Sequence, residues 1–402
     1  MFWDISDNTY DKRERAVETR PPAPSDVSLA SLPFAGSIAL LSVPPAGAAL
    51  EKINTITPAI ISFCKLMKTF LTGASGFIGN ALLRMLLDRG DEAHLLVRKT
   101  LPHGVDLSRV KLFRGDLDDR ATLREGMRGC DVVFHLAGLV RLASRDRSEL
   151  DRINVEGTRH ILETAASEGI RKVVYTSSIV AIGPSDGGVA DEKTIRKTPF
   201  FTDYERTKTL AEEEALRAAG RCLPVVVVSP SLVFGPTDFF DRYSFNRFLS
   251  ECISGKRVPI PGRGNKVINP VYIDDVARGH LLAFEKGKVG EKYILGGENI
   301  AMDALVQRVG DLLKKAPSVW HVPLPVLKGL GRIEMGLSRL SGREPRFDAS
   351  SAEAYRHDWA YSSRKAIDAL GYRPLSLREG LEKTAESILR GKNRPKYSEP
   401  AR

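Results

Sequence analysis

The sequence predicts an α/β fold in which a doubly wound parallel sheet carries helices on both faces and a smaller C-terminal lobe follows. Two observations lead to this fold class. From Lys68 onward, short apolar runs alternate with segments of helical periodicity. Between the first apolar run and the first helical segment lies a glycine-rich turn, from Gly73 to Gly79. Such a turn is typical of the first strand-to-helix connection in sheets of this kind.

Each apolar run has the length of a buried strand and is followed by a longer amphipathic segment. The predicted strands are 68–72, 93–97, 110–113, 131–135, 172–176 and 224–229, and the predicted helices are 77–89, 121–128, 151–168 and 204–219. Residues 271–273 and 293–295 look like strands that return to the main sheet. The chain is therefore expected to divide into a nucleotide-binding domain at 67–235 with returning segments near 268–297, a substrate lobe at 236–267 and 298–390, and a frayed tail at 391–402.

Residues 1–66 follow a different pattern, because prolines at 21–24 and 44–45 interrupt any periodicity. The acids Asp4, Asp7 and Asp11 argue against a signal peptide. We expect this segment to be disordered or a mis-assigned extension, with Met67 as the true initiator. An N-terminal anchor through residues 31–63 is the alternative.

The composition is that of a globular protein, with 42% hydrophobic and 27% charged residues. No uninterrupted apolar run reaches the ~18 residues of a membrane span. The four cysteines and seven histidines show no metal-ligand spacing, so neither a metal site nor a disulfide framework is indicated. The net charge of +10 is dispersed among acids, which favours an anionic cofactor or substrate over nucleic acid. A cytoplasmic location fits these features best.

The glycines Gly73, Gly76 and Gly79 form a G-x-x-G-x-x-G run between a strand and a helix. Glycine is needed where the backbone turns tightly and approaches a pyrophosphate without a Cβ in the way. The following helix directs its free N–H groups toward the phosphates. This context predicts a Rossmann-type dinucleotide site.

The end of the second strand indicates which dinucleotide binds. An acid at this point would accept from the ribose 2′-hydroxyl of NAD, whereas a nearby arginine accommodates the 2′-phosphate of NADP. Here the strand ends in Arg98 and Lys99, which favours NADP(H), with NAD(H) as the alternative. Asp116, after the third strand, is a candidate acceptor for the adenine amino group or a turn-capping residue. His135, at the end of the fourth strand, is expected to be a packed core residue.

Tyr204 and Lys208 are four residues apart, so they share one face of a predicted helix. A phenol is a poor base at neutral pH because its pKa is about 10. A cation ~4 Å away, at an effective dielectric constant near 20, contributes ~4 kcal/mol, so we expect Lys208 to lower the pKa of Tyr204. Ser178, at the end of the fifth strand, is expected to hydrogen-bond the substrate oxygen. Together with the dinucleotide-binding turn earlier in the chain, this arrangement predicts a redox enzyme.

These motifs resemble those of extended short-chain dehydrogenases/reductases of the NAD-dependent epimerase/dehydratase superfamily, over roughly residues 68–389. The matching runs are TGASGFIG at 72–79, GDL at 115–117, HLAG at 135–138, NVEGT at 154–158, YTSS at 175–178, YERTK at 204–208, SPSLVFGP at 229–236 and VYIDDVA at 271–277. The resemblance implies that Ser178, Tyr204 and Lys208 are catalytic, that Pro230 lies along the nicotinamide, and that Asn154 pins the central strands. The residues expected to bind the cofactor are Gly73, Ser75, Gly76, Phe77, Ile78, Gly79, Arg98, Lys99, Asp116, Leu117, Leu136, Ala137, Gly138, Tyr204, Lys208, Pro230 and Val233.

Within this superfamily the details are most similar to the dihydroflavonol-4-reductase-like subgroup. Sugar-nucleotide dehydratases carry Thr-Asp-Glu where this chain has Ser178-Ile179-Val180, so the groups that eliminate water are missing. Thr207 and Ser229 depart from the serine and arginine that are usual at these positions. The expected reaction is hydride transfer between the nicotinamide and a carbonyl or secondary alcohol. The alternatives are a nucleotide-sugar epimerase that uses NAD and, from another class, a regulator that senses NADP without catalysis.

The expected ligand is a small-molecule substrate, and the resemblance implies a homodimer formed through a helix pair. One further pattern stands apart from the motifs. An apolar stripe at helical spacing is flanked by cations, and it suggests an ordinary packed helix, a lid over an apolar substrate, or a patch on a membrane surface. The stripe consists of Val326, Leu327, Leu330, Ile333, Leu337 and Leu340.

Overall fold

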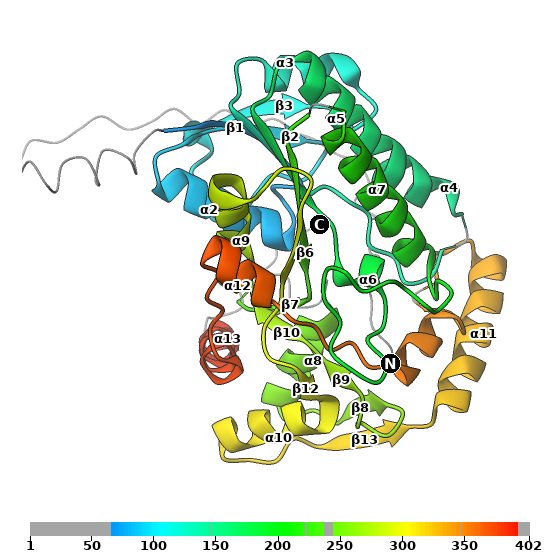
Figure 1. Cartoon of the computed structure of the whole chain (residues 1–402). Coiled ribbons are helices and arrows are strands. Elements are labelled where there is room, and N and C mark those ends of the chain that lie inside the picture. Colours follow the sequence, from blue (N-terminus) through cyan, green and yellow to red (C-terminus); the bar gives the residue numbers. More distant parts are fainter. Residues whose placement is uncertain (1–65, 145, 222, 237–243, 346, 393–402) are drawn as a thin grey trace, which may run out of the picture. The chain divides into compact units, whose positions relative to one another are not determined.

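The fold is built around a sheet of seven strands in the order β11-β6-β5-β4-β1-β2-β3, all paired in parallel (Figure 1). The structure is a computed structural model, which describes residues 66–392 apart from 145, 222, 237–243 and 346. The strands of the sheet are β1 (Lys68–Thr72), β2 (Glu92–Val97), β3 (Val110–Arg114), β4 (Val132–His135), β5 (Lys172–Thr176), β6 (Val225–Pro230) and β11 (Lys292–Leu295). The predicted fold class is confirmed.

Successive side chains of the central strands pack on opposite faces of the sheet. In β1, Phe70 and Leu71 are fully buried and belong to two different hydrophobic clusters. Val132 and Val133 of β4 divide in the same way. Strands that are buried on both faces appear in a sequence as continuous apolar runs, which is why the runs located them.

Helices cover both faces of the sheet (Figure 1). One layer holds α2 (Phe77–Asp88), α9 (Ile273–Lys286) and α12 (Arg364–Leu370), in which α9 packs against the other two. The opposite layer holds α3 (Arg120–Met127), α5 (Gly157–Ser167) and α7 (Asp203–Ala219), in which α5 packs against the other two. Short helical turns in this half of the chain are η1 (Leu107–Arg109), α4 (Ser148–Leu150), the π-helical η2 (Asp151–Glu156) and α6 (Ile179–Ile182).

The remaining elements form three two-stranded sheets and further helices. β7 (Leu232–Phe234) pairs with β10 (Pro270–Tyr272), β8 (Val258–Pro261) with β13 (Val319–Val322), and β9 (Val267–Ile268) with β12 (Ile300–Ala301). The helices are α8 (Ser244–Ile253), α10 (Met302–Leu313), α11 (Leu324–Ser341), η4 (Ser351–Arg356) and α13 (Leu377–Lys392). Leu71 of the main sheet and Val258 of β8 belong to one hydrophobic cluster, so this region packs continuously onto the sheet.

Two expectations for this region have different outcomes. Residues 293–295 do return to the main sheet, where β11 pairs with β6. The expectation that 271–273 does so is wrong, because β10 pairs with β7 in a separate sheet and Ile273 begins α9. α13 continues to Lys392, two residues into the segment expected to fray. The expectations for residues 1–65 and 393–402 fall outside the described residues.

Candidate active site

The glycine-rich turn between β1 and α2 forms a tight backbone cradle. Gly73 has φ +77°, a conformation that side chains rarely adopt, and its carbonyl accepts a 2.9 Å hydrogen bond from the Gly76 N–H. A Cβ on Gly73 would lie 2.7 Å from the Ala137 nitrogen, and a Cβ on Gly79 would lie 2.1 Å from the Gly73 carbonyl oxygen. The backbone of the cradle can therefore pack this closely only with glycine at positions 73 and 79.

The N-terminal end of α2 fits an anionic group. Gly76 is the N-cap residue, so it provides no side-chain cap, and the first turn of α2 contains no acid. Ser75 precedes this end of the helix, while Phe77 and Ile78 start it, which leaves backbone N–H groups for a ligand. These features are what a dinucleotide pyrophosphate requires.

Leu136, Ala137 and Gly138 follow β4 and form the neighbouring wall of the cradle. Ala137 N–H donates to Thr72 Oγ1 at 3.1 Å, and this bond ties the wall to the end of β1. β4 is hydrogen-bonded directly to β1, so the predicted residues of both loops meet at the carboxyl edge of the sheet.

A group of charged residues lies after β2 and β3. Arg98 and Lys99 are exposed, and Arg98 Nη1 is 3.9 Å from Asp116 Oδ2. Asp116 also accepts from the Leu117 N–H at 2.7 Å, and Arg152 Nη1 lies 3.6 Å from the same oxygen, Oδ2. Two guanidinium groups thus lie within 3.9 Å of one carboxylate oxygen where the adenosine end of a dinucleotide is expected.

Tyr204 lies in the first turn of α7, whose start is fixed by the Thr202 hydroxyl, which accepts from the Glu205 N–H at 3.1 Å. Ser178 caps α6 directly after β5. Burial raises the pKa of Tyr204 to about 12, and its interaction with the Ser178 hydroxyl partly offsets that rise. The two hydroxyl groups are therefore brought together, and the phenol is protonated at neutral pH.

Lys208 follows Tyr204 by one helical turn and is buried. Its Nζ donates to Tyr175 Oη at 3.0 Å and to the Thr176 carbonyl at 2.7 Å. Burial lowers the pKa of Lys208 to about 8, while the Glu212 carboxylate raises it. The expectation that Lys208 lowers the pKa of Tyr204 is wrong. Desolvation of the phenol dominates its pKa, and the Lys208 ammonium donates instead to Tyr175 Oη and to the Thr176 carbonyl.

A buried polar network next to Lys208 on α7 was not among the features predicted from the sequence. Glu212 is one turn beyond Lys208 on α7, and its carboxylate accepts from Ser177 Oγ at 2.5 Å and from Lys292 Nζ at 2.8 Å. Lys292 is in β11, far along the chain, so no local motif could show this contact. The only sequence signal is the continued spacing of four from Tyr204 through Lys208 to Glu212.

His135 and Asn154 support the site rather than form it. His135 is buried between the hydroxyls of Thr72 at 2.8 Å and Thr158 at 3.0 Å. Burial lowers its pKa to about 3, which agrees with the expectation that it is a packed core residue. Asn154, in η2, holds the backbone of Leu139 through both of its amide atoms and donates to Thr207 Oγ1 at 3.0 Å. It therefore connects the loop after β4 to α7, rather than joining the central strands.

The end of β6 completes the row of predicted residues. Pro230 is the last residue of β6, and Val233 is partly buried in β7. The Ser229 and Ser231 hydroxyls on either side of Pro230 are buried, with no hydrogen-bond partner among the described residues. Buried hydroxyl groups normally have a hydrogen-bond partner, so a polar ligand group at this edge of the sheet would supply the missing hydrogen bonds.

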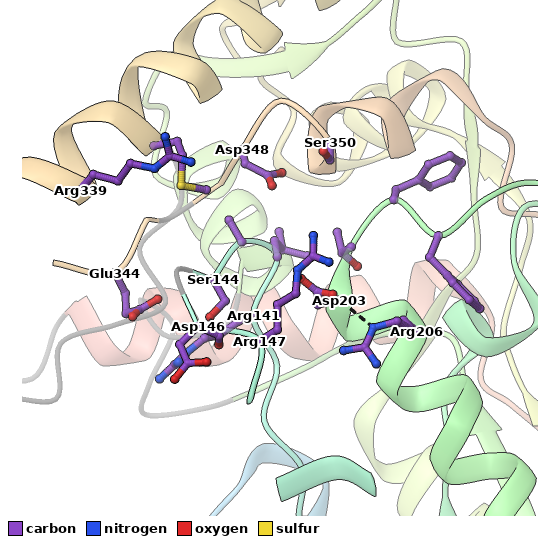
Figure 2. Close-up of a pocket in the computed structure, with 16 residues that line it drawn as sticks. Arg141, Ser144, Asp146, Arg147, Asp203, Arg206, Arg339, Glu344, Asp348 and Ser350 are labelled. Atoms are coloured by element: carbon purple, nitrogen blue, oxygen red, sulfur yellow. Dashed lines mark hydrogen bonds and ion pairs between the residues drawn. The ribbon is translucent and has the colours of Figure 1, made fainter. Parts of the chain in front are cut away.

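A cavity of about 850 Å³ lies beside the N-terminal end of α7 (Figure 2). Its walls come from the loop after β4, which contributes Arg141 and Ser144, from Asp203 and Arg206 of α7, and from Arg339 of α11. Figure 2 shows α11 across the cavity from α7 and the β4 loop. The volume is within the range of small-molecule sites.

The fold and this row of residues define a dinucleotide-dependent oxidoreductase. Residues 69–296 match the model of the NAD dependent epimerase/dehydratase family. A protein of Synechocystis sp. with the provisional name dihydroflavonol 4-reductase is 34% identical, covering 78% of this chain and 92% of that protein. Sterol demethylase protein B of Methylococcus capsulatus is 32% identical, covering 78% of this chain and 95% of that protein. The solved structure of gox2253 is 35% identical with a TM-score of 0.68, covering 82% of this chain and 99% of that one.

The chain therefore belongs to the NAD-dependent epimerase/dehydratase family of extended short-chain dehydrogenases/reductases. It is an NAD(P)-dependent oxidoreductase, and the resemblance seen in its motifs is confirmed. Among the described residues, no helix combines the length and the apolar character that crossing a bilayer requires.

Proposed function

We propose that this protein is an NADP(H)-dependent reductase that converts a ketone carbonyl to a secondary alcohol. The observation that carries the proposal is the pairing of a protonated Tyr204 with Ser178, beside a buried Lys208, at the same sheet edge as the glycine cradle. A phenol with a pKa of about 12 is a proton donor at neutral pH, which suits reduction.

The reduced nicotinamide supplies the hydride, and the residues of this chain orient the carbonyl and manage the proton. Ser178 and Tyr204 hydrogen-bond the carbonyl oxygen and fix its position. As the C=O π bond opens, its electron pair moves to the oxygen, and Tyr204 Oη transfers its proton there. The charge of Lys208 stabilises the phenolate that remains, which regains a proton from solvent.

The preference for NADP(H) is proposed from Arg98 and Lys99. Both side chains are exposed at the end of β2, and Arg98 is already beside Asp116 at the expected adenosine end. A 2′-phosphate placed there would gain charge-assisted hydrogen bonds from a guanidinium group.

The test is Tyr204→Phe, assayed by NADPH oxidation with a panel of ketones that includes 2-alkyl-3-oxoalkanoates, on which a relative from Stenotrophomonas maltophilia acts by name. Loss of the proton donor should lower kcat roughly 100-fold or more while the Kd for NADPH stays unchanged. Wild-type turnover in Tyr204→Phe, with intact NADPH binding, would refute the proposal.

A nucleotide-sugar epimerase is the second candidate, and the arginines of the cavity favour it. Arg141, Arg206 and Arg339 come from three different elements and could contact a diphosphate, although Glu149 and Asp151 already pair with the first two. An epimerase would retain NAD through purification and convert UDP-sugars with no net change in nicotinamide absorbance. The reductase is preferred because Arg98 and Lys99 match NADP.

A further inference from the structure

The outer face of α11 carries an exposed apolar stripe, which we call the α11 stripe. Its residues follow each other at intervals of three or four, so they align along one side of the helix. Their exposed fractions run from 36% to 87%, the highest being that of Leu340. The α11 stripe consists of Val326, Leu330, Ile333, Leu337 and Leu340.

The opposite side of α11 is already packed against the protein. Leu327 belongs to a small hydrophobic cluster with Val322 and Ala352, and Gly331 is so close to the chain that a Cβ there would lie 2.5 Å from the Asp348 carbonyl carbon. Lys328 forms an ion pair with Glu353 of η4. The helix is therefore held through its inner side, and the fold does not use the α11 stripe.

The charges beside the α11 stripe are mainly positive. Residues 324–344 contain four cationic and two acidic side chains, and within the part of the chain that the structure describes only Lys328 of these cations forms an ion pair. Arg332, Arg339 and Arg343 are exposed. An aliphatic stripe bordered by arginines matches the surface of an anionic bilayer, where aliphatic side chains enter the acyl boundary and guanidinium groups meet lipid phosphates. A second copy of the chain would match less well, because its own α11 carries the same excess of positive charge.

We propose that α11 is a docking helix that lies in the plane of an anionic phospholipid surface. The helix includes Arg332 and Arg339 within its 18 residues, which suits a helix that lies on a bilayer rather than one that spans it. Met335 and Arg339 also line the cavity beside α7, so docking would hold that cavity next to the lipid surface (Figure 2). The inference concerns a surface and does not rest on the proposed reaction.

The test is co-sedimentation of the full chain with large unilamellar vesicles of phosphatidylcholine, alone or mixed with phosphatidylglycerol. We expect binding to the mixed vesicles that weakens as salt is added, because screening reduces the contribution of the arginines. The double variant Ile333→Asn/Leu337→Asn should lower the partition ratio at least about tenfold, since two large apolar side chains are lost from the contact. Both side chains are more than half exposed, so the fold and NADPH binding should be retained.

The matched control is Val189→Asn/Ile195→Asn, which removes two apolar side chains of similar exposure from the loop between α6 and α7. This variant should bind mixed vesicles like the wild type. Three results would overturn the proposal: a wild-type protein that does not bind mixed vesicles, a stripe variant that binds as well as the wild type, and equal losses in both double variants. Light scattering on both variants identifies the rival occupant, because loss of a dimer with unchanged vesicle binding would assign the α11 stripe to a second copy and refute lipid docking.

Discussion

Replacing Gly79 by alanine tests whether the cradle is as tight as its geometry indicates. The new Cβ would lie 2.1 Å from the Gly73 carbonyl oxygen and 2.7 Å from its carbonyl carbon. Ordinary contact begins near 3.4 Å, so the first turn of α2 and the Gly73 peptide must separate by roughly 1.3 Å. Gly73 is itself closely packed, because a Cβ on it would lie 2.7 Å from the Ala137 nitrogen and 2.8 Å from the Leu136 carbonyl carbon.

The expected cost of this overpacking is about 1–3 kcal/mol of folding free energy. Separation of the helix from the turn also displaces the N–H groups offered to a phosphate, so the Kd for NADPH should rise about tenfold, which corresponds to about 1.4 kcal/mol. Urea unfolding without cofactor measures the first quantity, and a fluorescence titration with NADPH measures the second.

Gly188→Ala is the matched control, because Gly188 lies in an exposed loop and a Cβ there would meet nothing within 4 Å. It should unfold and bind NADPH like the wild type. If Gly79→Ala also kept the wild-type urea midpoint and Kd, the inferred cradle would be wrong, both in its packing and in its assignment to the cofactor.

Three further predictions concern charged side chains. Arg98→Ala should raise the Kd for NADPH at least about tenfold and leave the Kd for NADH unchanged within error, because only NADPH carries the 2′-phosphate. An equal change in both Kd values would show that Arg98 does not bind the 2′-phosphate. The kcat/KM for NADPH should be constant below pH 8 and fall above it, since burial lowers the pKa of Lys208 to about 8 and the neutral amine no longer stabilises a phenolate. Glu212→Gln should move this fall to lower pH, because the Glu212 carboxylate raises the pKa of Lys208, and an unchanged profile would separate Lys208 from catalysis.

The main sheet was predictable because its signal is local. Strands such as β5 and β6 are buried on both faces, and each appears as a short apolar run in the sequence. The same signal failed at 271–273, which is also apolar and buried. A run of this kind shows that a strand is covered but not which strand is its neighbour, and here the neighbour is β7 rather than a strand of the main sheet.

The candidate site likewise has some features that the sequence predicts and others that it does not. The glycine spacing and the Tyr204–Lys208 pair could be predicted from the sequence, because each lies within a single turn or a single helix. The partners of Lys208 could not be predicted, because they lie outside α7. Tyr175 is in β5, and Lys292, which donates to Glu212, is in β11. The exposure of the α11 stripe was also out of reach, since periodicity shows that a helix has an apolar side but not whether that side is covered.

The raised pKa of Tyr204 and the buried charge of Lys208 are compatible when they are assigned to different stages of the proposed reduction. In the resting protein, burial keeps the phenol protonated, which is the form that a proton donor needs. As the proton leaves, negative charge develops on Tyr204 Oη in surroundings of low dielectric constant, where an ammonium group one helical turn away has its strongest effect. Lys208 would then stabilise the transition state more than the ground state, and this difference, not a low resting pKa, is what accelerates proton transfer. Glu212 would then have a positioning role, because its carboxylate raises the pKa of Lys208 and so favours the charged amine at neutral pH.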